Sequence, residues 1–129
     1  MGFFKKKEAP ELRGDLQEAK GRLAHTRGYD ILFTSVEDEL MPNETVISVF
    51  PGTGIAVLTS SRVLLWKMNL RGPESIDIPL SRITSAKLRS KVMSSEVVVT
   101  AADSEIEISG PNAADAKAFV DAVRGAVAA

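Results

Sequence analysis

The chain has 129 residues, a formal net charge of −1 and no cysteine. A chain of this length fits one domain with a short appendage, and the lack of cysteine excludes disulfides, thiolate catalysis and sulfur-ligated metal sites. The near-neutral charge argues against nucleic acid as a partner, because domains that read nucleic acid usually carry a basic excess.

Residues 1–9 are expected to form a flexible basic terminus. Two aromatic residues stand beside three cations there, namely Phe3, Phe4, Lys5, Lys6 and Lys7. This combination suits a weak, reversible contact with an anionic lipid surface, where each basic residue contributes about 1 kcal/mol. A disordered start that only improves solubility is the alternative. The stretch is too short and too soon charged for a secretory signal.

Residues 10–42 are predicted to be a helical extension ahead of the main domain. Two apolar stripes at helical spacing follow each other there, and the second ends before Pro42. They comprise Leu12, Leu16, Ala19 and Leu23, then Tyr29, Leu32, Phe33, Val36 and Leu40. Gly14 and Gly21 weaken the first helix by about 1 kcal/mol each relative to alanine, so it must dock on another surface. Docking on the same domain is favoured over binding to another subunit.

After Asn43 the apolar period changes from helical to alternating, which indicates strands. The segments that read as strands are 45–50, 53–60, 62–68, 74–80, 83–91, 96–102 and 104–109. The alternation is clearest in "SIDIPL" and "EIEIS", where one face is apolar and the other polar. Because the turns between segments are short, the strands are predicted to pair antiparallel.

The last segment returns to a helical period. Asn112 is a suitable N-cap, and an apolar stripe then runs through Ala116, Phe119, Val120, Val123 and Val127. Residues 43–129 are therefore predicted to form an α+β, mainly β domain. It is expected to be a seven-stranded antiparallel bent barrel capped by the C-terminal helix and preceded by the two short N-terminal helices.

Residues 40–127 resemble the bacterial pleckstrin-homology-like (PH-like) domains and, more loosely, the GRAM domains. "LMPNETVISVF" looks like the opening of that family, in which a helix end runs through a turn into the first strand. "GIAVLTSSRVLLW" is similar to its strand-turn-strand piece, with a Thr-Ser-x-Arg-type turn. "IDIPLSRITSAKL" resembles the next piece, and "AADAKAFVDAV" stands where the capping helix would be. The resemblance implies the bent barrel with its helical cap, a binding role and no catalysis.

Some eukaryotic members of that family bind phosphoinositides, and others bind proteins or assemble with themselves. The members that bind phosphoinositides carry basic residues around the first hairpin. Here the predicted hairpin tip, residues 50–54, has no basic residue. A phosphate needs a positive charge or converging backbone donors, so the resemblance does not extend to an inositol-phosphate site at this hairpin.

A row of basic residues alternates along one predicted strand and projects from one side of the sheet. The row consists of Lys87, Arg89 and Lys91. It is a candidate contact for an acidic partner, a phosphate or a membrane. The alternative is a solvated strand face that Glu105 and Glu107 balance across the sheet.

The sequence thus predicts a non-enzymatic PH-like binding module that acts in protein–protein interaction or self-assembly, with no cofactor and no metal. The only histidine, His25, cannot build a histidine-rich zinc site, and no serine lies in a nucleophile elbow. Candidate interface residues are Leu12, Leu16, Leu23 and the only tryptophan, Trp66.

The alternative function is a peripheral membrane protein that binds anionic lipid through the "FFKKK" segment and the basic strand face. A cytoplasmic location is expected, because a chain without cysteine fits a reducing compartment. The alternative function would place the protein at the inner face of the membrane.

Overall fold

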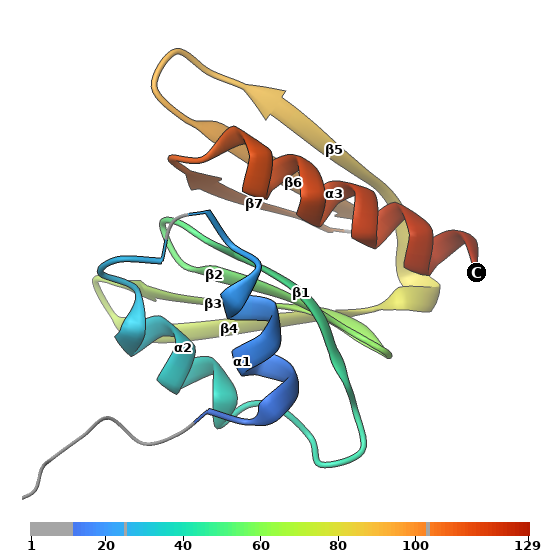
Figure 1. Ribbon diagram of the computed structural model, residues 1–129. Helices are drawn as coiled ribbons and strands as arrows, with labels where there is room; N and C mark the ends of the chain where they lie inside the picture. The colour runs from blue at the N-terminus through green and yellow to red at the C-terminus, as the bar shows by residue number, and fades with distance from the viewer. Residues whose placement is uncertain (1–11, 25, 103) are drawn as a thin grey trace, which may run out of the picture.

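The computed structural model describes residues 12–24, 26–102 and 104–129. Within them, the strands form two antiparallel sheets that three α-helices accompany (Figure 1). The four-stranded sheet contains β1 (Val46–Pro51), β2 (Ile55–Thr59), β3 (Arg62–Asn69) and β4 (Gly72–Pro79) in that order. The three-stranded sheet contains β5 (Ile83–Ser90), β6 (Ser95–Ala101) and β7 (Ser104–Gly110). The helices are α1 (Gly14–Gly21), α2 (Asp30–Glu37) and α3 (Ala113–Ala128), and a short 3-10 turn, η2 (Leu80–Arg82), joins the sheets.

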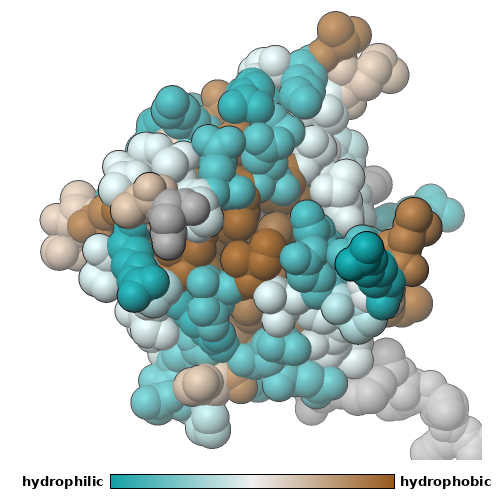
Figure 2. Space-filling model, turned by 180° about the vertical axis from the view of Figure 1, so that it is seen from behind, coloured by the Kyte–Doolittle hydropathy of each residue, from teal (hydrophilic) through white to brown (hydrophobic). Residues whose placement is uncertain are grey.

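The two sheets do not close into a barrel, so the predicted closed barrel is wrong. The seven antiparallel strands, the C-terminal helix and the two N-terminal helices are confirmed. Helix α3 covers the opening between the sheets, because it contacts β5 and β6 of one sheet and β1 and β2 of the other. A helix that bridges both sheets fills space that further strand pairing would otherwise have to close. Seen from behind, apolar surface shows at the centre of the molecule within a frame of hydrophilic side chains (Figure 2).

The larger core lies between the two sheets and beneath α3. Its side chains alternate along each strand, as the pleat of a sheet requires. In β7, for example, Ile106 and Ile108 are buried while Glu105 and Glu107 are exposed. Burial of one large aliphatic or aromatic side chain contributes about 1.5–3 kcal/mol. This core includes Phe50, Leu58, Val63, Leu65, Val97, Val99, Phe119 and Val123.

A second core lies on the other face of the four-stranded sheet, where α1 and α2 pack. It includes Leu16, Phe33, Val36, Val57, Leu64 and Trp66. Because both faces of the sheet are covered, every residue of β2 is buried. The N-terminal helices therefore dock on their own domain, which is the arrangement that the sequence favoured.

Carboxylates fasten α1 and the chain that follows it. Asp15 accepts hydrogen bonds from the Val46 N–H at 2.7 Å and from the Arg13 guanidinium at 2.8 Å. Burial raises the pKa of Asp15, but the Val46 and Arg13 contacts outweigh it and lower that pKa overall. At the other end, Asp115 of α3 accepts from the Ala24 N–H at 3.0 Å. Helix α1 is thus bonded to β1, and the chain that follows it is bonded to α3.

A largely buried ion pair joins the end of α2 to the turn between β2 and β3. The Arg62 guanidinium donates to Glu44 at 2.8 Å, to Asp77 at 2.8 Å and to the Glu39 carbonyl at 2.7 Å. Glu44 is only 5% exposed. Burial raises the pKa of Glu44, but the bonds from Arg62 and from the Met41 N–H outweigh it and lower that pKa from 4.5 to about 2.

The β1–β2 hairpin approaches the end of β7 closely. The Thr53 N–H donates to the Ser109 carbonyl at 2.8 Å, which links the hairpin tip of one sheet to the last strand of the other. Gly52 permits this approach, because a Cβ at that position would strike the Ser109 carbonyl oxygen and lie 2.9 Å from Gly110 Cα. The sequence assigned Gly52 to a turn, and the structure shows the additional packing requirement.

Replacement of Glu44 by glutamine is expected to lower the free energy of unfolding at neutral pH by about 2 kcal/mol, measured by urea denaturation. The folded-state pKa of Glu44 lies below its ordinary value, so the stabilisation is complete above about pH 5 and is lost as the pH falls towards about 2. The difference between wild type and Glu44→Gln should therefore shrink over that range. Glu18→Gln, at a side chain that is 78% exposed, is the control and should change stability by less than about 0.5 kcal/mol. A difference that stays constant with pH would contradict the assignment.

Gly52→Ala is expected to destabilise the protein by about 1–3 kcal/mol, because the methyl group meets backbone atoms that cannot rotate away. Gly125→Ala is the matched control. No atom lies within 4 Å of the added methyl group there, and alanine is favoured over glycine in a helix by about 1 kcal/mol. Chemical denaturation midpoints should move in opposite directions for the two variants. Equal midpoints would show that the hairpin and β7 are not held in close contact.

Candidate functional site

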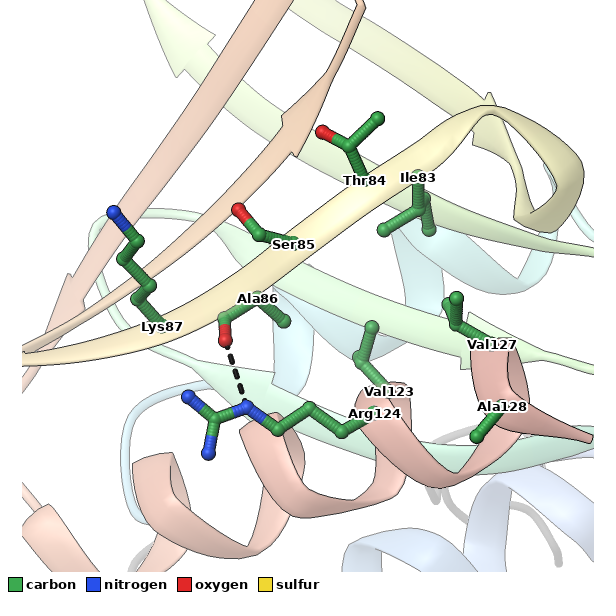
Figure 3. A pocket seen from close by; sticks show the side chains of 9 residues that line it. All are labelled: Ile83, Thr84, Ser85, Ala86, Lys87, Val123, Arg124, Val127 and Ala128. Atoms are coloured by element: carbon green, nitrogen blue, oxygen red, sulfur yellow. Dashed lines mark hydrogen bonds between the residues drawn. The ribbon is translucent and has the colours of Figure 1, made fainter.

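A groove runs between β5 and α3, on the outer side of the three-stranded sheet's free edge. Its volume is about 380 Å³. Strand β5 supplies one wall and the last turns of α3 supply the other (Figure 3). The lining residues are Ile83, Thr84, Ser85, Ala86, Lys87, Val123, Arg124, Val127 and Ala128.

The groove exists because α3 extends past the core that it covers. Its start is fixed by Asn112, whose side chain accepts from the Asp115 N–H at 3.0 Å. Phe119 and Val123 are then fully buried, whereas Val127, one turn later, is 38% exposed. The sequence showed Val127 as the end of an apolar stripe but gave no sign that its last member would lie beside an open strand.

Arg124 lies across the groove (Figure 3). Its Nε donates to the Ala86 carbonyl of β5 at 2.9 Å. Its two terminal nitrogens have no hydrogen-bond or ion-pair partner in the described part of the chain. An anchored guanidinium whose two terminal nitrogens are free can donate hydrogen bonds to a planar anion such as a carboxylate. Arg124 lies outside the apolar stripe from which the sequence predicted this helix.

The outer edge of β5 carries unpaired backbone groups. Lys91 N–H bonds to Ser94 O at 2.9 Å, and Arg89 and Lys87 stand opposite Glu96 and Val98 of β6. In an antiparallel pair the hydrogen-bonded residues alternate. The backbone groups of residues 87 and 89 therefore face β6, and those of residues 86, 88 and 90 face outward. Only the carbonyl of residue 86 has a partner on that side among the described residues.

Each of the other sheet edges is occupied or interrupted at some of its residues. On β1, the Ile47 carbonyl accepts from Arg22 at 2.7 Å, and the Val46 N–H is bonded to α1 as described above. Strand β4 has Pro73 and Pro79 at its two ends, and proline has no N–H to offer a neighbouring strand. The far end of β7 bonds to the β1–β2 hairpin. Strand β5 is the edge that combines outward backbone groups with an adjacent groove.

The predicted basic row is largely neutralised. Glu96 of β6 is buried and lies 2.7 Å from Arg89 and 3.4 Å from Lys91. Burial raises the pKa of Glu96, but Lys91 and Arg89 outweigh it, so that pKa is lowered. Arg89 also lies 3.9 Å from Glu107. Within the described ranges Lys87 alone of the row has no ion pair.

These contacts favour the balanced strand face over a dedicated anion site. The three cations of the row share their side of the sheet with three carboxylates, Glu96, Glu105 and Glu107. The sequence expected the balance to come from Glu105 and Glu107. It missed Glu96, which stands directly opposite Arg89.

The four apolar residues predicted as interface candidates lie within the second core. Leu16 and Trp66 are buried there, and Leu12 and Leu23 pack against it while partly exposed. The chain therefore covers these side chains itself. The other candidates, residues 3–7, and also His25, lie outside the described residues, so the membrane-binding alternative that depends on "FFKKK" stays a prediction.

No group of three or more histidine or acidic residues is arranged to hold a metal within the described ranges. The helices there also lack the combined length and apolar character that a membrane span needs.

Comparison with known families gives one match of high coverage. The sequence profile described as "Bacterial PH domain" matches residues 30–125, which takes in α2, all the strands and most of α3. Comparison with curated protein sequences gave no match.

Solved structures show the same fold at low identity. One is a pleckstrin homology domain from Shewanella amazonensis SB2B, with a TM-score of 0.54 and 14% identity. The similarity covers 73% of this chain and 96% of that one. A DUF1696 family protein with a pleckstrin-homology domain from Shewanella loihica PV-4 has a TM-score of 0.53 and 13% identity, over 76% and 98% of the two chains.

Proposed function

The chain belongs to the bacterial PH domain family, and we propose that it is a non-enzymatic module that binds a protein partner. Members of this family are generally non-catalytic binding modules. The contact we propose is an extended segment of the partner, added as a strand to the open edge of β5 beside α3.

One observation carries this proposal: the open edge of β5 lies next to an apolar groove. Strand addition takes its affinity from main-chain hydrogen bonds and its specificity from pockets for alternate side chains. The outward backbone groups of Leu88 and Ser90 are available for such main-chain hydrogen bonds. Ile83 and Val127 line a pocket that can take an apolar side chain of the added strand.

A different protein fits this edge better than a second copy that would pair β5 with β5. Such a pair would bring Lys87 and Arg124 of one copy close to the same two cations of the other. Like charges across a strand pair are destabilising. This leaves a heterologous segment as the favoured partner.

Peptides selected from a random display library on the wild-type protein test the proposal. Their dissociation constants, measured by fluorescence anisotropy, should rise about tenfold or more with Val127→Asp, because a bound apolar side chain would then face a carboxylate. Val92→Asp, at a tip residue that is 98% exposed, is the matched control and should leave binding unchanged. Amide chemical-shift changes on binding should concentrate in residues 83–90 and 123–128.

The proposal fails if no peptide is enriched, or if the selected peptides bind Val127→Asp as tightly as wild type. It also fails if the shift changes lie elsewhere on the molecule. Circular dichroism of both variants checks that the fold is intact.

A further inference from the structure

We propose that Arg124 reads an acidic side chain of the bound strand, so that the groove selects segments with an aspartate or glutamate two residues from an apolar residue. This inference rests on the proposed function, because it specifies the partner of the same groove.

The first argument is that Arg124 is held in place before any partner arrives. The bond from its Nε to the Ala86 carbonyl, 2.9 Å long, fixes the guanidinium beside the strand edge. Figure 3 shows the side chain lying across the groove, with one terminal nitrogen directed away from β5. Because little side-chain freedom remains to be lost, a carboxylate that binds there keeps more of the interaction energy.

The second argument is charge. The groove is lined by two cations, Lys87 and Arg124, and by no carboxylate in the described part of the chain. The nearby acid on α3, Asp121, is already paired with Lys117 at 2.8 Å. A basic segment would be repelled at this position, and a neutral one would leave the guanidinium without a partner.

The third argument is spacing. A strand that bonds to Leu88 and Ser90 and continues along β5 would pass Arg124 beside Ala86. Further along, it would reach the pocket formed by Ile83 and Val127. Side chains two residues apart lie on one face of a strand, separated by about 6.7 Å. Arg124 and Val127 are almost one helical turn apart, which is about 4.5 Å along the axis. One strand face therefore presents an acid to Arg124 and an apolar side chain to Val127.

Lys87 does not belong to the same anion site. Its side chain leaves the opposite face of β5 from Arg124 (Figure 3). It would lie beside the intervening residue of the bound strand, which points the other way. The selectivity for an acid two residues from an apolar side chain is therefore assigned to Arg124.

Display selections on wild type, Arg124→Glu and Arg71→Glu test this inference. Wild type should enrich peptides with aspartate or glutamate two positions from an apolar residue, and Arg124→Glu should enrich lysine or arginine at that position instead. Arg71→Glu makes the same change of net charge at an exposed site in the β3–β4 turn, and it should select the wild-type pattern. Arg124→Gln should weaken binding of the wild-type peptides by about fivefold to tenfold.

The outcomes separate this inference from the proposed function. Peptides that map to the groove but show no acid preference, or that bind Arg124→Gln and wild type equally, overturn the role of Arg124 and leave strand binding standing. If Arg71→Glu weakens binding as much as Arg124→Glu, overall charge is responsible and the inference fails. If no peptide maps to the groove, both fail together.

Discussion

The constraint on which the structure depends is that two sheets with apolar inner faces share no strand pairing. The core between them must then be covered by something other than strands. Helix α3 does this, because its stripe of Ala116, Phe119, Val120 and Val123 is buried against both sheets. Sealing the core with a helix leaves the sheet edges as separate features, each of which must be paired, blocked or left open.

The contacts made by the outer edge of each sheet explain where a partner can bind. The N-terminal helices occupy β1, prolines bound β4, and the β1–β2 hairpin holds the end of β7. These helices belong to the same body as the strands, because they build the second core and because Arg62 and Glu44 bond the end of α2 to the four-stranded sheet. The edge of β5 is distinguished from the other edges because the overhanging last turn of α3 gives it an apolar pocket and a fixed guanidinium.

Local patterns in the sequence predicted the elements well, because alternation and helical stripes reflect which side chains meet the core. "EIEIS" indicated which face of β7 is buried, and Asn112 indicated where α3 begins. Contacts between distant segments were not predictable in the same way. Closure of the barrel depends on whether the first and last strands meet, and no local pattern encodes that. Trp66 and Leu65 are both buried although they point to opposite faces, because α1 and α2 cover the second face. Arg124 looked like a solvated residue, since nothing in its neighbours reveals the Ala86 carbonyl beside it.

Amide hydrogen exchange along β5 tests most directly whether α3 seals the core while leaving this edge open. Residue-resolved exchange followed by NMR should show strong protection for Lys87 and Arg89, whose N–H groups bond to β6, and rapid exchange for Leu88 and Ser90. The amides of α3 from residues 116 to 123 should be protected in the same experiment. Slow exchange at Leu88 and Ser90 would mean that the β5 edge is already covered, and rapid exchange throughout α3 would mean that the helix does not seal the core. Either result would contradict the account.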